Sequence, residues 1–103
     1  MQMKHHDLLR GLIRLHILFH AVEGDLYGQW MIHELARHGY RVGAGTLYPM
    51  LSAMERKGYL KSKRQRTGRT FRRIYRATAL GRRACTLAKL KVGELSRELK
   101  VKH

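Results

Sequence analysis

The segment from Lys61 to Arg76 carries the side chains of this chain that are best suited to chemistry, and that chemistry is phosphate binding. The segment has eight basic side chains and no acidic one. Lys and Arg donate charge-assisted hydrogen bonds to phosphate oxygens, and a basic hairpin without a polyanionic partner would suffer strong self-repulsion. The basic residues are Lys61, Lys63, Arg64, Arg66, Arg69, Arg72, Arg73 and Arg76.

Catalytic groups do not gather anywhere along the chain. It has no paired-carboxylate site, no phosphate loop and no nucleophile with an evident base. His16 and His20 have the four-residue spacing that can hold a metal, but no Cys or carboxylate at metal-site spacing accompanies them. We therefore expect no enzyme activity, no metal site and no cofactor, and a metal-dependent enzyme is the most remote alternative.

A short helix over Thr46–Gly58 directly precedes the basic segment. Thr46 is the expected N-cap, Pro49 is expected in the first turn, and Gly58 is the expected end. The spacing turns one face inward, formed by Leu47, Met50, Leu51 and Met54. It leaves Tyr48 and Ser52 outward, with Thr46 and Pro49 near the exposed start.

The basic segment itself predicts two strands, Leu60–Arg66 and Thr70–Ala77, around Thr67-Gly68. A small amphipathic helix followed by a basic hairpin is typical of a winged helix-turn-helix. The expected fold is mainly α with a small β-hairpin. Its third helix would enter the major groove of DNA, and the hairpin would contact the flanking backbone or minor groove.

Two further helices are expected before this pair. The first covers about Leu8–Val22, is capped by Asp7, and has a buried stripe of Leu8, Leu12, Leu15, Phe19 and Val22. The second covers about Tyr27–His38 and ends at Gly39. It buries some of Trp30, Met31, Ile32 and Leu35, and Trp30 is either a core residue or part of a pocket at a dimer axis.

A long last helix is expected from its cap at Thr78 to about Lys100. Its apolar stripe consists of Cys85, Ala88, Val92, Leu95 and Leu99. The distal part of this stripe has little of its own chain to cover it, so a second subunit is the expected cover. The predicted organisation is a DNA-binding unit over residues 1–77 and a dimerisation helix over 78–103, within one compact unit.

The formal net charge of +15 and the pI near 11.0 agree with a polyanionic partner. The most apolar segment, 8–22, is interrupted by Arg10, Arg14, His16 and His20, so no membrane partner is expected. The single Cys85 fits a reducing cytoplasm. Charge alone would equally allow a small RNA- or ribosome-associated protein. The stripe of the last helix favours a symmetric dimer instead, and hence a palindromic DNA site.

The motifs of this chain resemble those of the PadR family of bacterial transcriptional regulators. The resemblance covers nearly the whole chain. It rests on Tyr27-Gly28, Leu35, Gly45-Thr46-Leu47-Tyr48-Pro49, Leu51, Glu55, Gly58-Tyr59-Leu60, Gly68-Arg69, Arg72-Arg73, Tyr75, Thr78 and Gly81-Arg82. The chain departs from the family pattern at Thr70-Phe71, where many relatives have a shorter Arg-Pro-type continuation.

This resemblance implies a winged-helix homodimer whose final helix packs against the first helix of the partner, including Leu8 and Leu12. It also implies repression from palindromic operators that a small effector relieves. By matching position, it assigns DNA contacts to Thr46, Tyr48, Pro49, Ser52, Arg69, Arg72 and Arg73. The basic run adds Lys63, Arg64 and Arg66.

In the resembling family the first and last helices of both subunits enclose a space near the dimer axis. Here the first helix would bring His16 and His20 to that space, and the second helix would bring Trp30. An apolar wall with a few titratable groups suits a small planar or aromatic effector. Cys85 is expected as a small buried residue at the seam of the dimer.

Overall fold

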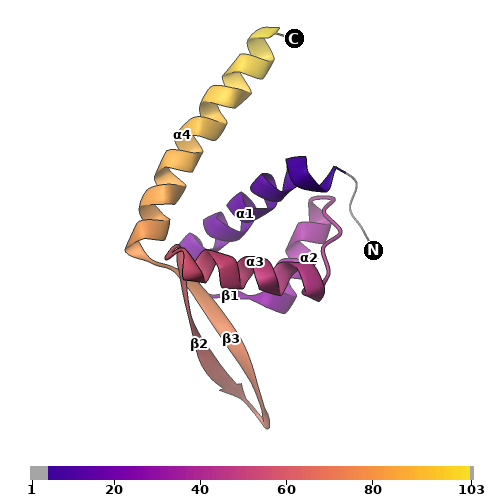
Figure 1. The fold of residues 1–103 in the computed structure, drawn as a ribbon, viewed down its shortest axis with the longest axis vertical. Helices are drawn as coiled ribbons and strands as arrows, with labels where there is room; N and C mark the ends of the chain where they lie inside the picture. Colours follow the sequence, from indigo (N-terminus) through magenta and orange to yellow (C-terminus); the bar gives the residue numbers. More distant parts are fainter. Residues whose placement is uncertain (1–4, 103) are drawn as a thin grey trace.

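The computed structural model describes residues 5–102, and the expected ranges 1–77 and 78–103 therefore include residues 1–4 and 103 that lie outside it. Four helices and three short strands follow one another along the chain. They are α1 (His6–Glu23), β1 (Leu26–Tyr27), α2 (Gly28–Arg37), α3 (Ala44–Arg56), β2 (Leu60–Thr67), β3 (Thr70–Ala77) and α4 (Ala79–Lys102). In Figure 1 the hairpin of β2 and β3 and the helix α4 extend in opposite directions from a body formed by α1, α2 and α3.

Helix α1 differs from its expected form at its start and in its buried face. It begins at His6, so Asp7 lies inside the first turn and does not cap it. Its buried residues are Ile13, Ile17, Leu18 and Ala21. The expected buried stripe is wrong at Leu8 and Leu12, which are 79% and 43% exposed. Both stripes have helical spacing, and only packing against the other helices chooses between them.

Helices α2 and α3 both end as expected, each at a glycine with a positive φ. Gly39 follows α2 and Gly58 follows α3, both with φ of 89°. After α2, the amide of Tyr40 donates to the carbonyl of Leu35 at 2.9 Å, and Tyr59 makes the equivalent bond after α3. These are Schellman closures, which favour glycine because an L side chain is strained at such φ values.

The start of α3 was predicted wrongly. Its N-cap is Gly43, whose carbonyl accepts a hydrogen bond from the amide of Leu47 at 2.9 Å. Thr46 therefore lies within the first turn, and Pro49 is the sixth helical residue rather than part of the first turn. Pro49 is exposed, so water can reach the backbone carbonyl that its missing N–H leaves without a partner. The inward face is confirmed: Leu47, Met50, Leu51 and Met54 are all buried.

The sheet has one strand more than the sequence indicated. Its order is β1-β3-β2, with all pairs antiparallel. Strand β1 pairs Leu26 with Tyr75 and Tyr27 with Ile74, so Tyr27 is not the start of a helix. The hairpin itself is confirmed, with Leu60 opposite Ala77 at its base and Thr67 opposite Thr70 at its tip. The turn is Gly68-Arg69, and Gly68 has a φ of 63°.

Thr78 caps α4, as expected. Its hydroxyl accepts a hydrogen bond from the amide of Gly81 at 3.0 Å and donates one to the carbonyl of Gly58. The first turns of α4 belong to the core, since Cys85 is 2% exposed within its own chain. Cys85 is thus a core residue and not a residue of a dimer seam. Within residues 5–102, no helix combines the length and apolarity that crossing a membrane requires.

Candidate nucleic-acid interface

The exposed flank of α3 begins with Tyr48. This side chain is 38% exposed, while Pro49 and Ser52 are exposed and Thr46 is half-buried. At about 100° per helical residue, Tyr48 and Ser52 share one flank, and Thr46 lies on the other side of the helix from Tyr48. Thr46 can therefore contact DNA only through the first turn of α3, not as part of the Tyr48 flank.

The ring of Tyr48 rests on the backbone at the start of α2. A Cβ atom added to Gly28 would lie 2.5 Å from the Tyr48 hydroxyl oxygen and 2.6 Å from two ring carbons. No side chain fits between them, so the absence of a side chain at Gly28 sets where the ring lies. Spacing along the chain gave no sign of this contact, because it joins residues twenty positions apart.

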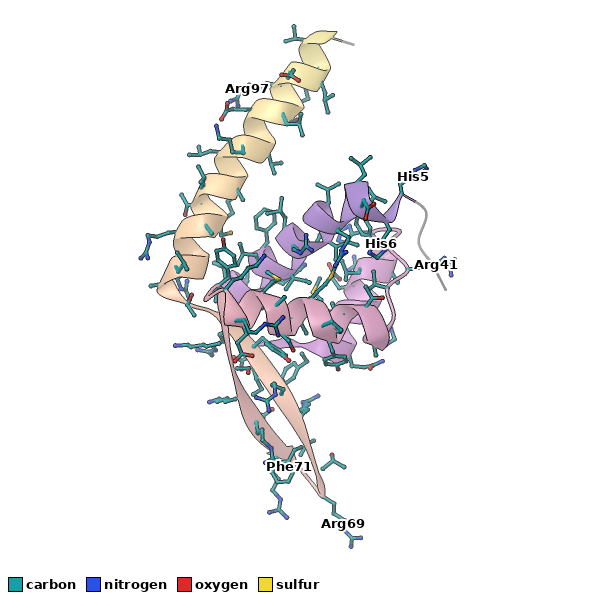
Figure 2. The ribbon with its side chains drawn as sticks, in the orientation of Figure 1. His5, His6, Arg41, Arg69, Phe71 and Arg97 are labelled. Atoms are coloured by element: carbon teal, nitrogen blue, oxygen red, sulfur yellow. The ribbon has the colours of Figure 1, made fainter. Side chains whose placement is uncertain are left out.

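The hairpin divides its basic residues between two faces. Residues directly opposite one another in the register share a face, and successive residues alternate. Ser62 contacts Glu55 of α3, so the face of Ser62 adjoins that helix. The α3-side face has Arg64, Arg66 and Arg73, and the far face has Lys61, Lys63, Arg72 and Arg76. Arg69 lies in the turn and points away from the body (Figure 2).

A chain of three polar side chains fixes the α3-side face against α3. Arg73 donates to the Ser62 hydroxyl at 3.1 Å, and Ser62 donates to the Glu55 carboxylate at 2.8 Å. Glu55 thus supports a hairpin arginine through Ser62. Beneath them, burial raises the pKa of the Tyr75 phenol and the charge of Arg73 offsets this only in part, so the phenol stays neutral.

Two of the four basic side chains on the far face have partners in or next to β1. The guanidinium carbon of Arg72 lies 4.0 Å from the centroid of the Tyr27 ring, and Tyr27 donates a hydrogen bond to Gln65 at 3.2 Å. Arg76 is paired with Asp25. Arg72 and Arg76 on the far face thus already have partners within the chain. On the α3-side face, Arg64 and Arg66 have no acidic partner among the described residues.

A groove of about 600 Å³ joins the helical and hairpin parts of this surface. Its lining contains four aromatic side chains and two arginines. The residues are Tyr27, Gly28, Gln29, Trp30, His33, Tyr48, Phe71, Arg72 and Arg73. The structure thus brings together Tyr48, Arg72 and Arg73 among the expected DNA-contacting residues, and it leaves Lys63 on the far face.

Sequence reasoning missed Phe71 as a residue of this surface. Phe71 is 53% exposed, and the guanidinium carbon of Arg64 lies 4.2 Å from its ring centroid. The only sequence signal was the departure from the family pattern at Thr70-Phe71. Trp30 also lines the groove, which places it beside Tyr48 rather than in the core.

The residues of the expected effector pocket have partners within their own subunit. His20 lies edge-on to Trp30 with 5.1 Å between ring centroids, and its nitrogens face Glu23 and Glu34. His16 instead packs against the ring of His38, at 4.7 Å between centroids. Among residues 5–102, no group of three or more His, Cys, Asp or Glu side chains is arranged to hold a metal ion.

Two titratable groups of this cluster have altered pKa values. Burial lowers the pKa of His16 below 6.5, the His38 and His20 charges lower it further, and Glu34 opposes them. Burial by itself would raise the pKa of Glu34. Hydrogen bonds from His38 and Arg37, with the Arg37 and His20 charges, outweigh burial and lower it below 4.5. The cluster therefore favours an ionised Glu34 and a neutral His16.

Four of the seven expected dimer-interface residues line an open apolar hollow between α1 and the distal half of α4, and Leu8, Cys85 and Ala88 are not among them. The hollow measures about 680 Å³ and is lined by Leu12, Val92, Leu95, Ser96, Leu99 and Lys100. Ala88 lies nearer the core and lines a separate hollow with Leu15, Leu18 and Met54. The structure thus joins Leu12 with the stripe of Val92, Leu95 and Leu99.

Comparisons with known proteins place this chain among transcriptional regulators. The model of a family described as "Transcriptional regulator PadR-like family" matches residues 17–87, which include α3 and the hairpin. Transcriptional regulator Rv3488 of Mycobacterium tuberculosis (strain ATCC 25618 / H37Rv) is 47% identical over 93 residues, covering 90% of this chain and 87% of that protein. A PadR family transcriptional regulator from Eggerthella lenta DSM 2243 superposes with a TM-score of 0.78 at 30% identity, covering 91% and 83% of the two chains. A transcriptional regulator from Clostridium thermocellum gives 0.76 at 28%, covering 93% and 96%.

Proposed function

Because this chain belongs to the PadR-like family of transcriptional regulators, we propose that it is a sequence-specific repressor that binds double-stranded DNA as a homodimer. The observation that carries this proposal is the continuity of one surface. The exposed flank of α3, with Tyr48 seated on Gly28, adjoins a hairpin face. Among residues 5–102 the arginines of that face have no acidic partner except Glu55, which Arg73 reaches through Ser62. Complementarity to DNA follows from both shape and charge.

In this proposal α3 enters the major groove and presents Tyr48 and Ser52 to base edges. Tyr48 offers a hydroxyl for hydrogen bonding and an apolar ring edge, which suits contact with both base and backbone. The hairpin then follows the DNA backbone. The hydrogen bonds from Arg73 to Ser62 and from Ser62 to Glu55 hold the hairpin at a set angle to α3. The two elements would therefore contact DNA as one rigid unit.

The hollow beside α4 supports the dimer. Leu95 and Leu99 are about half exposed although they are large and apolar, and Leu12 of α1 lies beside them. A second copy can place its own α1 and α4 against this hollow. The exposed apolar side chains of both subunits would then be buried together, as a two-fold interface requires. A symmetric dimer would place two α3 helices against a palindromic site.

We also propose that a small effector relieves repression, and the contact between His20 and Trp30 supports this part. An aromatic ring beside titratable side chains suits a small planar or aromatic molecule. Such a ligand would act only if it bound one dimer geometry more tightly than the other. Trp30 fluorescence would then respond to the ligand, and operator affinity would fall by about 5–150-fold.

The direct experiment is selection of duplexes from a random-sequence library by the full chain, followed by binding titrations of the selected duplex at several salt concentrations. We expect a palindromic consensus. We also expect a log–log salt slope of about −5 to −9, which corresponds to roughly 6–10 neutralised phosphates per dimer. Duplex RNA of matched length serves as the competitor. Equal competition by the RNA, with no consensus in the selected DNA, would favour the RNA-associated alternative.

A further inference from the structure

Phe71 stands near the tip of the hairpin among charged and polar side chains. From Lys61 to Arg73 it is the one aromatic residue, and half of its surface is exposed. Figure 2 places it beside Arg69 at the end of the hairpin farthest from the helices. Single exposed aromatic residues are common in proteins, so exposure alone assigns no role. The surroundings of this ring are more informative than its exposure.

Arginines flank the ring on the α3-side face of the hairpin. The guanidinium carbon of Arg64 lies 4.2 Å from the ring centroid, and that of Arg66 lies at 6.0 Å. The ring also lines the groove that contains Tyr48 and Trp30. The aromatic ring therefore has two cations within 6.0 Å and lines the surface that we propose meets DNA.

The tip is held in shape by local hydrogen bonds. The hydroxyl of Thr70 donates to the carbonyl of Thr67 at 3.0 Å, and the Nε of Arg66 donates to the carbonyl of Gly68 at 3.0 Å. Gly68 supplies the positive φ of the two-residue turn. A side chain presented from such a tip loses little conformational freedom on binding, which favours its use as a rigid contact.

The reach of the hairpin fits the spacing of DNA grooves. Phe71 lies six residues before Ala77 at the base, so the strand carries it about 20 Å from the core at ~3.3 Å per residue. Adjacent major and minor grooves are separated by about half of the ~34 Å helical repeat. With α3 in a major groove, the tip can reach the neighbouring minor groove.

We propose that Phe71 is a wedge that enters the minor groove beside each half-site and selects deformable base steps. This inference rests on the proposed DNA-binding function. Apolar side chains that enter the minor groove partly unstack a base step and kink the duplex, and pyrimidine–purine steps kink most readily. Arg64 and Arg66 would bind the phosphates that flank the minor groove at the kinked step. Phe71 would thus add specificity at positions that α3 never touches.

The test compares full-length protein with Phe71→Ala and Phe71→Leu in duplex selection and in titrations of the selected duplex. Thr67→Ala is the matched control, since Thr67 lies at the same tip on the far face. We expect the unmodified protein to select TA or CA steps about half a turn outside each half-site. Phe71→Ala should lose this preference and bind the selected duplex about tenfold more weakly, with unchanged binding to random duplex. Phe71→Leu should retain part of the base-step preference and part of the affinity for the selected duplex.

A fluorescent 2-aminopurine placed at the selected step gives an independent readout, because its emission rises on unstacking. The emission should rise with the unmodified protein and with Thr67→Ala, but not with Phe71→Ala. If Phe71→Ala selects the same flanking steps and produces the same rise, the wedge is refuted while DNA recognition by α3 stands. If the unmodified protein selects no DNA sequence at all, the proposed function and the wedge both fail.

Discussion

The contact between Gly28 and Tyr48 shows how one missing side chain positions another residue. The ring occupies the space where a Cβ atom of residue 28 would be, so the start of α2 determines the direction of a side chain on α3. A glycine at this position is therefore explained by packing against Tyr48 and not by turn geometry, since its φ is not in the left-handed region.

Gly28→Ala should displace Tyr48, because the added Cβ would lie only 2.5 Å from the hydroxyl oxygen. We expect binding to the selected operator to weaken about tenfold, the scale of one mismatched base pair, with little change in binding to random duplex. Fluorescence anisotropy titrations measure both affinities. Gly24→Ala is the control, because its Cβ would meet nothing within 4 Å. Equal affinities for the two variants would contradict the positioning role.

Tyr48 and Arg69 should differ in the kind of binding that they support. Tyr48→Ala should narrow the ratio between operator and random-duplex affinity, because the side chain lies on the exposed flank of α3 that we propose faces base edges. Arg69→Ala should weaken both affinities by a similar factor and reduce the salt slope by about one per subunit, as expected for a phosphate contact. Titrations of both duplexes at three salt concentrations separate these outcomes. A selective loss of operator binding in Arg69→Ala would indicate base reading by the hairpin tip instead.

At the scale of elements, α4 changes its role along its length. Its first turns are buried in the core through Cys85, while the later turns leave Val92, Leu95 and Leu99 partly exposed beside Leu12. The hairpin changes its role from face to face. On the far face Arg72 contacts Tyr27 of β1 and Arg76 pairs with Asp25, whereas the α3-side face adjoins the flank of α3 that we propose binds DNA.

Leu95→Asp should dissociate the proposed dimer. The carboxylate would be buried without a partner in an apolar seam, which costs about 3–5 kcal/mol and raises the dissociation constant by more than ~100-fold. Sedimentation at micromolar concentration should then give the 12.1 kDa monomer. Leu90→Asp is the matched control, because Leu90 is exposed about 140° around the helix from Leu95. Leu95→Asp should also lose tight operator binding, because two half-sites are then no longer held at a fixed spacing. If the unmodified protein is itself a monomer at this concentration, the proposed dimer is refuted.

At the scale of the whole molecule, the histidine and Glu34 cluster links stability to pH. The folded-state pKa of His16 is lowered, so its contribution to stability is complete above about pH 6.5 and declines as the pH falls below that value. The pKa of Glu34 is also lowered, and its contribution declines only below about pH 4.5. The stability that depends on His16 is therefore lost at a higher pH than the stability that depends on Glu34.

Urea unfolding at pH 7.5 and pH 5.5 tests the first of these losses. We expect a lower free energy of unfolding at pH 5.5, and a smaller decrease between the two pH values in His16→Gln than in the unmodified protein. His33→Gln is the control, because His33 is exposed and lines the groove beside Tyr48. The same decrease in all three proteins would show that His16 does not carry the effect.

Local signals in the sequence determined most of the elements of this protein. The two glycine-terminated helices, the Thr78 cap and the hairpin depend on neighbouring residues, and each is present as expected. The charge of the basic segment is a property of its composition, so the sequence alone predicted a surface for nucleic acid. The inward face of α3 followed from helical spacing, since that helix has a single run of large apolar residues.

Tertiary structure decided what local signals leave open. Helix α1 has two apolar stripes, and packing buried Ile13 and Ile17 while it left Leu8 and Leu12 exposed. A strand as short as β1 has no periodicity of its own and exists only through pairing with β3. The contact of Tyr48 with Gly28 and the place of Phe71 between arginines join residues distant in sequence or on different strands. Such contacts depend on three-dimensional register, which no local pattern encodes.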